Sequence, residues 1–456
     1  MKEEKMEVAR EVARFIVRTD LSQIPAQVIE KGKRCILDAL GCGVYGQEFE
    51  ATKIVSQLAR EWGGCPEASI IGAGTKVPSG IAALSNGIAI HVADYDDSSV
   101  LFRGHPTSVV LPPVLALSET KLKSGRDLLL AYILGIEVGG KLGKVMGWPH
   151  YEAGWHGTGT IGTIASAAAS SKVLGLDEEK TSHALAIAAS EASGIRENFG
   201  TMVKSFHAGQ ASAAGVLASL LAEKGYKGSL TAFEGQSGFR RVFSGESEMS
   251  RWASELGEPY VLMDVGFKRY PCCATIHPAL DALEDFRKAH PFSWEDVEEV
   301  KCLFPPVILS ILVYPEPHTG LEAKFSLQYC ISSFLVHGKL DLSHFEKEAL
   351  SDPKVRKLMP RVKMAPSKDL ENLMKAENLL APTDIEVKLK KQTLSSRILE
   401  AKGGPSSSLQ MEEVEEKFRT CAGRILSSEK VEKAIDLVSS LESLEKVNIL
   451  ADTLNP

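Results

Sequence analysis

The stretch Gly157–Ser171, with the sequence GTGTIGTIASAAASS, consists almost entirely of small residues. A second stretch of the same kind runs from Ala208 to Leu221. Small side chains let two helices approach closely, so that one backbone packs directly against the other. The two stretches therefore predict a tightly packed bundle of helices.

Apolar residues recur at spacings of three and four through most of the first two-thirds of the chain, which is the period of an amphipathic helix. The short apolar segment Ala68–Ile71 is instead expected to form a strand or one arm of a hairpin. The helices expected from the periodicity span Val8–Thr19, Pro25–Leu40, Thr52–Trp62, Ser79–Ala93, Pro112–Glu119, Gly125–Met146, Asp177–Ser190 and Ser205–Lys224.

The pattern changes near Val265, where β-branched residues and alternation become more common. Strands are expected at Val297–Phe304, Asp384–Leu389 and Ile398–Ala401, with helices at Leu321–Val336 and Pro353–Leu358. After a Gly/Ser-rich linker at 403–408, helices return at Glu412–Ile425 and Ser428–Leu441. We therefore predict a mainly α protein: a large all-helical domain built from both chain ends (1–266 and 403–456) and a smaller inserted α+β domain (267–402).

The composition narrows the class of function. The chain has 456 residues, of which 44% are hydrophobic and 24% charged, and its net charge is −7. A negative net charge does not favour binding to nucleic acid or to an anionic membrane. An anionic substrate would therefore need a local basic pocket. From the sequence we expect neither a signal peptide nor a membrane-spanning stretch, and the eight cysteines include no CxxC pair. We expect a cytoplasmic protein whose cysteines are buried small hydrophobic residues.

Three patterns suggest chemistries that we rank low. GTGTIG at 157–162 matches a dinucleotide-binding fingerprint, but no strand precedes it. DYDD at 94–97 resembles the acid motif of a class of terpene cyclases, whose carbocation cavities are aromatic, whereas only 7% of this chain is aromatic. The same acidic residues could hold magnesium, but there is neither a second acidic cluster nor a phosphate loop. The sequence also lacks an acyl nucleophile elbow and zinc-ligand spacing, so no metal is expected.

The histidines are the side chains best suited to proton transfer near neutral pH. Their contexts predict that His183 and His91 are packing residues and that five others lie at the surface, namely His150, His290, His318, His337 and His344.

Four further histidines have unusual neighbours. His105 follows Arg103-Gly104 in a turn, and His156 lies in a glycine-rich loop. His207 follows Lys204 by about one helical turn, and His277 closes the run that begins at Lys268. With the acid cluster and the cations Lys204, Lys268 and Arg269, these histidines suit a pocket that binds a small polycarboxylate and moves protons on it.

At these residues the sequence resembles the MmgE/PrpD family, which includes 2-methylcitrate dehydratase, cis-aconitate decarboxylase and iminodisuccinate epimerase. The similarity runs through essentially the whole chain. The motifs that carry it are, in chain order, HVADYDDS (91–98), HP (105–106), GWHGT (154–158), KSFHAG (204–209), KRYPCCATIH (268–277), EAKFS (322–326) and VEEKFR (414–419).

The resemblance implies that the helical domain and a smaller α+β lid enclose an active site, and that the protein is a homodimer working without a cofactor or metal. Position 98 is Ser where decarboxylase-like members often have Thr, and Arg103-Gly104 gives the following loop a length and charge of its own. The site positions that carry over from the family are Asp94, Ser98, His105, His156, Lys204, His277 and Tyr314.

From the chemistry of the family's substrates we predict roles for two groups of residues. The catalytic residues are Asp94, His105, His156, Lys204 and His277. The substrate-binding residues are Ser98, His207, Lys268, Arg269 and Tyr314.

We expect a carbon–oxygen lyase of the 2-methylcitrate dehydratase type, which removes a proton next to a carboxylate and eliminates a hydroxyl group. One alternative is a cis-aconitate-type decarboxylase or an iminodisuccinate-type epimerase on the same scaffold. A further alternative is a non-catalytic helical protein that binds a polycarboxylate.

Overall fold

The computed structural model describes residues 7–245 and 248–456, and the chain divides into two compact units. Of these described residues, unit 1 comprises those within 7–197, 205–265 and 410–456, and unit 2 comprises 198–204 and 266–409. Helices predominate and the strands are few, which confirms the predicted mainly α fold class. None of the helices in the described part of the chain combines the length and the apolar character that a membrane crossing requires.

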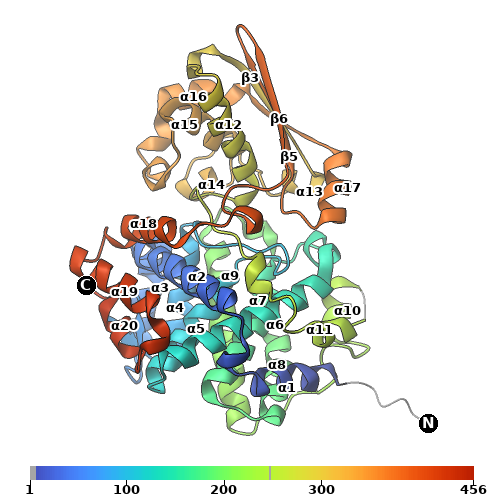
Figure 1. Ribbon diagram of the computed structural model, residues 1–456, viewed down its shortest axis with the longest axis vertical. Helices are drawn as coiled ribbons and strands as arrows, with labels where there is room; N and C mark the ends of the chain where they lie inside the picture. Colours follow the sequence, from blue (N-terminus) through green and yellow to red (C-terminus); the bar gives the residue numbers. More distant parts are fainter. Residues whose placement is uncertain (1–6, 246–247) are drawn as a thin grey trace. The chain divides into compact units, whose positions relative to one another are not determined.

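Unit 1 is a helical assembly whose first and last elements come from the two ends of the chain (Figure 1). The first turn of α9, through Lys204, groups with unit 2. The helices are α1 (Val8–Arg18), α2 (Ala26–Tyr45), α3 (Glu50–Trp62), α4 (Ser79–Val92), α5 (Thr107–Thr120), α6 (Gly125–Glu152), α7 (Gly157–Leu174), α8 (Glu178–Glu191), α9 (Met202–Glu223), α10 (Phe239–Ser244), α11 (Ser250–Ser254), α18 (Met411–Ala422), α19 (Ser428–Ser439) and α20 (Asn448–Thr453).

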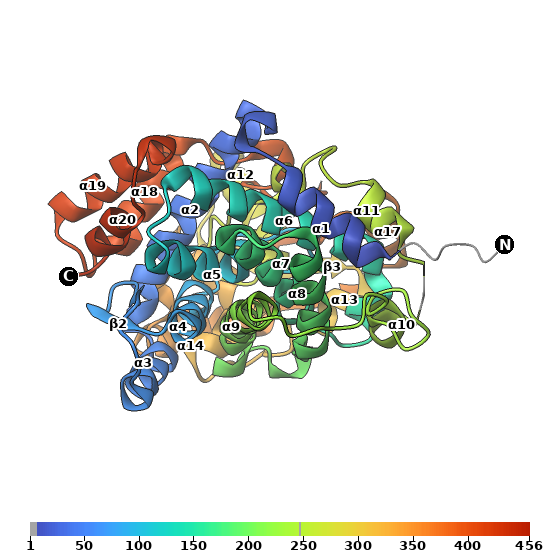
Figure 2. The same cartoon turned by 90° about the horizontal axis from the view of Figure 1, so that it is seen from below.

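Helix α7 is formed by the small-residue stretch and is buried along nearly its whole length. It packs against α5, α6 and α8, as Figure 2 shows. The second small-residue stretch lies in α9, where a Cβ atom added to Gly215 would fall 2.1 Å from Ser166 Oγ of α7. The close helix packing predicted from these two stretches is therefore confirmed.

Helix α5 begins more than one turn before the predicted start at Pro112, because the two prolines inside it do not break it. Pro112 and Pro113 have no N–H group to donate to the carbonyl oxygens of Ser108 and Val109, one turn earlier. The hydroxyl of Ser212 on α9 lies 3.4 Å and 3.2 Å from these two oxygens, respectively. The same hydroxyl lies 2.9 Å from the Ala208 carbonyl oxygen of its own helix, so its one proton is shared among three acceptors and only partly replaces the missing donors.

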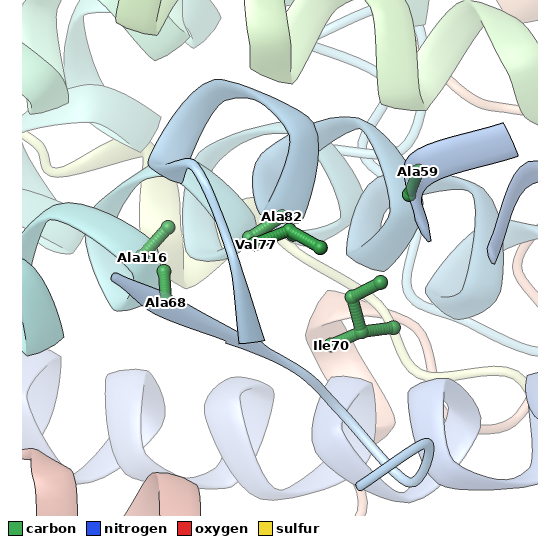
Figure 3. Close-up of a cluster of buried hydrophobic side chains, with 6 residues drawn as sticks. All are labelled: Ala59, Ala68, Ile70, Val77, Ala82 and Ala116. Atoms are coloured by element: carbon green, nitrogen blue, oxygen red, sulfur yellow. The ribbon is translucent and has the colours of Figure 1, made fainter. Parts of the chain in front are cut away.

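Unit 1 also contains a short β-hairpin, so the prediction that this part of the chain is all helical was too strict. Strands β1 (Ala68–Ile70) and β2 (Thr75–Val77) pair antiparallel, at the segment expected to form a strand or hairpin arm. The hairpin packs on α3, α4 and α5 through a cluster of buried hydrophobic side chains, shown in Figure 3: Ala59, Ala68, Ile70, Val77, Ala82 and Ala116.

The two ends of unit 1 are joined by a buried ion pair between α2 and α18. The Lys417 ammonium lies 2.7 Å from Asp38 Oδ1, donates to the Tyr95 carbonyl oxygen at 2.7 Å, and sits 3.8 Å above the Tyr95 ring. Burial by itself lowers the pKa of Lys417, but its neighbours Asp38, Cys42 and Tyr95, with Asp38 the strongest of them, together outweigh burial and raise the pKa. Lys417 therefore stays charged and holds both α2 and the loop that follows α4.

Replacing Lys417 with Met is expected to lower the free energy of unfolding by about 3–5 kcal/mol, because Asp38 is left as a buried charge without its cation. Chemical denaturation measures this loss. The exposed Lys433→Met on α19 serves as the control. Replacing both partners, as Asp38→Leu with Lys417→Met, should recover much of the loss. A single Lys417→Met variant as stable as the control would show that the pair does not tie the chain ends together.

Unit 2 is built on a four-stranded sheet with the order β4-β3-β5-β6. Strands β3 (Val297–Phe304) and β4 (Val362–Pro366) run parallel, and the pairs with β5 (Thr383–Leu389) and β6 (Thr393–Ile398) are antiparallel. The helices of this unit are α12 (His277–Ala289), α13 (Pro306–Leu309), α14 (Gly320–Ala323), α15 (Leu327–His337), α16 (Pro353–Leu358) and α17 (Lys368–Glu377).

The sheet of unit 2 was only partly predictable. Buried and exposed residues largely alternate along β3 and β5, and both were expected within a residue or two. The last strand was expected at Ile398–Ala401 but lies at 393–398, because β6 has no buried residue and therefore no clear apolar alternation.

Candidate active site

The loop after α4 carries the first group of candidate residues, and its shape is set by Asp94. This residue has a positive φ of 51°, a conformation that Asp tolerates better than most residues because its short side chain can bond locally. The Asp94 N–H donates to the His91 carbonyl oxygen at 3.0 Å. Asp94 is buried, and the chain turns sharply at the end of α4 to bring the following acidic residues back toward the helix.

His91 and His105 share the carboxylate of Asp96. His91 Nδ1 lies 2.8 Å from Asp96 Oδ2, and His105 Nδ1 lies 3.7 Å from the same oxygen. His105 Nδ1 also lies 2.7 Å from the Asp97 carbonyl oxygen, which can only accept, so His105 donates from Nδ1. In neutral His105 the basic lone pair is therefore on Nε2. The carboxylate of Asp96 thus faces the Nδ1 atoms of both rings.

The side chain of Asp97 ties the loop to Thr107, the first residue of α5. It accepts hydrogen bonds from the N–H group and the hydroxyl group of Thr107, and that hydroxyl lies 2.6 Å from the Tyr132 hydroxyl. Burial raises the pKa of the Asp97 carboxyl to about 7, although the bonds from Thr107 oppose the shift. Because Asp97 is held in this way, its carbonyl oxygen has a fixed position against His105.

The Arg103-Gly104 turn interlocks with the start of α7. A Cβ atom on Gly104 would fall 2.4 Å from Thr158 Oγ1, so only glycine allows this approach. The His105 N–H donates to the same Thr158 oxygen at 3.1 Å. The His105 ring centroid consequently lies 6.3 Å from that of His156, which precedes the first residue of α7.

His156 pairs with His207 of α9 through a contact of 3.0 Å between their Nδ1 atoms. One of the two nitrogens must donate and the other accept, so the two rings share one proton at this contact. Both histidines are buried. Two overlapping sets of side chains each place one possible metal-ligand atom per residue within 4.8 Å of the others. The first set is His91, His105 and His156, and the second is His91, Asp94, Asp96 and His105. Either set is compact enough to hold a metal ion.

Unit 2 carries the remaining candidate residues, beginning with its buried lysines. Lys204 is buried, and its ammonium lies 5.6 Å and 5.4 Å from the ring centroids of Phe199 and Phe325. Lys268 is 1% exposed. Arg269 is paired with Asp281 at 2.8 Å and with Glu284 at 3.1 Å, so two carboxylates compensate its charge.

His277 and Tyr314 are also held firmly in unit 2. His277 opens α12 and is buried, with Nε2 3.3 Å from the Cys272 carbonyl oxygen. The Tyr314 hydroxyl donates to the Phe199 carbonyl oxygen at 2.8 Å. Gly200, with φ of 83°, packs against the Tyr314 ring so tightly that an added Cβ would lie 2.4 Å from it.

Two models of one protein family match most of the chain. The MmgE/PrpD N-terminal domain model matches residues 10–251, and the MmgE/PrpD C-terminal domain model matches residues 270–443. The chain belongs to the MmgE/PrpD family.

Several curated relatives match nearly the whole chain. Cis-aconitate decarboxylase of Homo sapiens is 32% identical over 94% of this chain and 90% of the relative. Cis-aconitate decarboxylase of Aspergillus terreus (strain NIH 2624 / FGSC A1156) is 27% identical over 99% of this chain and 96% of the relative. 2-Methylcitrate dehydratase of Escherichia coli is 26% identical over 72% of this chain and 71% of the relative. These relatives fit the decarboxylase alternative better than the dehydratase reading that the sequence analysis put first.

Within this MmgE/PrpD chain, unit 1 brings together four of the predicted site residues: Asp94, His105, His156 and His207. Ser98 lies partly buried on the same loop. His91, which the sequence analysis assigned to packing, belongs to the same cluster, and so does Asp96. The spacing of three residues between His91 and Asp94, about one helical turn, is the signal in the sequence that could have found this arrangement. The catalytic and binding roles assigned to all of these residues stay predictions.

Two histidines expected at the surface are buried, and both have structural partners. His344 Nδ1 lies 2.8 Å from Asp341 Oδ1. His150 Nε2 lies 2.8 Å from Thr160 Oγ1, and its Nδ1 lies 3.2 Å from the Phe243 carbonyl oxygen. Burial lowers the pKa of His150 to about 4, and the nearby Arg103 adds to the effect. His183 is buried against the Gly228 carbonyl oxygen, as expected for a packing residue.

The low pKa of His150 predicts that this histidine destabilises the protein in mild acid. At pH 5 the unfolded chain binds a proton on His150 that the folded protein excludes, which costs about 2 kcal/mol for a shift from 6.5 to about 4. This loss sets in as the pH falls below 6.5, and it is absent at pH 7.5. Denaturant unfolding at the two pH values should therefore differ less in His150→Gln than in the wild type. An equal pH dependence in both proteins, with the exposed His290→Gln as control, would contradict the assignment.

Proposed function

We propose that this protein is a lyase of small polycarboxylates and that it decarboxylates cis-aconitate or a close analogue. The observation that carries the proposal is the cluster of His91, His105 and His156, with His207 behind it, in a chain similar over 94–99% of its length to proteins named cis-aconitate decarboxylase. The cluster provides several proton-transfer groups in fixed positions, and the reaction needs a proton at one carbon.

The chemistry of cis-aconitate explains why such a site is suitable. Loss of CO2 breaks the bond between the CH2 carbon and its carboxylate. The released electron pair forms a new double bond, and the electrons of the old double bond move to the carbon beside the other terminal carboxylate. That carbon then takes up one proton and leaves a five-carbon dicarboxylate. The enzyme must therefore stabilise an enediolate-like charge and deliver a proton.

His105 is our first choice for the proton donor. Its Nδ1 proton is held by the Asp97 carbonyl oxygen, and the carboxylate of Asp96 lies 3.7 Å from the same nitrogen. Because Nδ1 is bonded to the carbonyl oxygen, the proton that His105 would deliver is the one on Nε2. His156 is the second candidate, because its contact with His207 could pass a proton to it from the neighbouring ring.

The buried lysines Lys204 and Lys268 are assigned to charge neutralisation of the substrate carboxylates. Arg269 was predicted to share this role, but its pairing with Asp281 and Glu284 favours a structural one. His277 stays a candidate for a second titrating group. We keep Asp94, Ser98 and Tyr314 as proposed contacts to the carboxylates or to a substrate hydroxyl.

Dehydration of a 2-methylcitrate-type substrate is the second candidate function. It needs a base to remove a proton and an acid to protonate the departing hydroxyl, and so at least two titrating groups. The presence of two histidine contacts in unit 1, His91–His105 and His156–His207, is compatible with this requirement. The predicted homodimer and cytoplasmic location also stay proposals.

Incubating the purified protein with cis-aconitate, 2-methylcitrate, citrate and iminodisuccinate, followed by NMR of the products, distinguishes these functions. We expect cis-aconitate to lose CO2 and give a five-carbon dicarboxylate. Water loss from 2-methylcitrate alone would support the dehydratase instead, and inversion of iminodisuccinate an epimerase. No turnover of any of the four would leave a polycarboxylate-binding protein and contradict the proposed function.

Three single variants test the assigned residues. His105→Gln should lower kcat by about 100-fold or more, because the proton donor is lost. Lys204→Ala and His277→Ala should each reduce kcat/KM strongly, whereas His290→Gln, an exposed residue of unit 2, should leave it unchanged. Steady-state kinetics with cis-aconitate measures these effects. Wild-type rates in both Lys204→Ala and His277→Ala would rule out the unit 2 assignments.

A further inference from the structure

The histidine cluster has a second chemical capacity that acid–base catalysis does not use. One nitrogen from each of His91, His105 and His156 lies within 4.8 Å of the other two. Nitrogens bound tetrahedrally to one zinc ion, at about 2.1 Å from it, are about 3.4 Å apart. Small rotations of the three rings would therefore bring them to the spacing that a metal ion requires.

The surroundings of the three rings are also those of a metal site. His91 Nδ1 is 2.8 Å from the Asp96 carboxylate, His105 Nδ1 is 2.7 Å from a backbone carbonyl, and His156 Nδ1 is 3.0 Å from His207. Histidines that bind metals through one nitrogen almost always use the other for a hydrogen bond of this kind, which fixes the ring and its tautomer. The carboxylate and carbonyl partners hold the protons of His91 and His105 on Nδ1, which leaves their lone pairs on Nε2. His156 matches them in the tautomer in which its Nδ1 donates to His207.

Helices and backbone hydrogen bonds position the three rings. His91 lies in the last turn of α4, His156 directly precedes α7, and His105 is fixed by Thr158 at the start of that helix. The side chains of His91 and Asp96 are fully buried, and that of His105 is 12% exposed. A site of this kind is largely formed before an ion arrives, so ligand ordering adds little to the cost of binding.

We propose that His91, His105 and His156 bind a divalent transition-metal ion of the zinc type, and that this ion silences the proton transfer assigned to the same rings. Three imidazole nitrogens suit Zn²⁺, Co²⁺, Ni²⁺ or Cu²⁺, whereas Mg²⁺ and Ca²⁺ need several oxygen ligands. The overlapping set with Asp94 and Asp96 offers only two carboxylates, and Asp96 is already bonded to His91. Mg²⁺ is therefore expected not to compete.

The inhibitory part of this inference rests on the proposed function, whereas metal binding itself does not. An ion takes the lone pairs on Nε2 through which His105 or His156 would carry the reacting proton. Zinc bound at the triad should thus inhibit cis-aconitate turnover, and a chelator should restore it. Because polycarboxylates bind zinc in solution, inhibition must be measured at a buffered free-ion concentration.

Binding is tested on the full chain after metal removal, with Co²⁺ as a spectroscopic probe and Zn²⁺ in calorimetric titration. The exposed thiol of Cys65 is removed by Cys65→Ser in all samples, so that it offers no competing ligand. We expect one ion per chain, with the visible absorption of Co²⁺ in a low-coordination nitrogen site, and no response to Mg²⁺. His156→Gln should weaken binding by about 100-fold or more, and His207→Ala by about 10–100-fold because it only orients His156.

The outcomes separate the two proposals. The absence of a Co²⁺ spectrum, or a spectrum and affinity unchanged in both His91→Gln and His156→Gln, would overturn the metal site. His290→Gln serves as the matched control, and thermal unfolding verifies that the variants are folded. Metal binding by a protein whose metal-free form does not turn over cis-aconitate would contradict the proposed function but leave the metal site intact. Binding together with full activity at saturating zinc would overturn the inhibitory role.

Discussion

A single buried cation, the ammonium of Lys417, connects the parts of unit 1 on which the candidate site depends. Lys417 lies on α18, near the C-terminus, and forms an ion pair with the Asp38 carboxylate of α2. Its ammonium also donates to the carbonyl oxygen of Tyr95. Tyr95 lies between Asp94 and Asp96, so the ion pair that joins the chain ends also fixes the loop carrying the acidic residues. The end of the chain therefore contributes to the site without supplying a residue to it.

The fixed loop in turn determines where protons lie on the histidines. A backbone carbonyl of Asp97 and the carboxylate of Asp96 face the Nδ1 atoms of His105 and His91, respectively. Because these partners occupy Nδ1, the atom that would deliver a proton or bind a metal ion is Nε2. The same feature accounts for both proposals, since proton delivery and metal binding are alternative uses of one set of nitrogens.

The sequence predicts the fold better than the site, for reasons visible in particular residues. Small residues in α7 and α9 indicate close packing because their pattern is local, and the helices follow from local periodicity. Contacts between distant segments cannot be predicted from local sequence. Ser212 of α9 faces the carbonyl oxygens that Pro112 and Pro113 leave without a backbone donor, and His150 is buried against Phe243 and Thr160. His91 looked like a packing residue because its partners Asp96 and His105 are brought to it only by the turn at Asp94. The family motifs identified the neighbouring site positions, which periodicity alone could not.

The central claim is that this site delivers a proton to the carbon left electron-rich when CO2 departs. The most direct test is turnover of cis-aconitate in D2O, with NMR of the product. The account predicts one solvent deuteron at the carbon beside the terminal carboxylate, formed by the wild type and strongly slowed in His105→Gln. A product without deuterium at that carbon, or cis-aconitate left unchanged by the wild type, would contradict it.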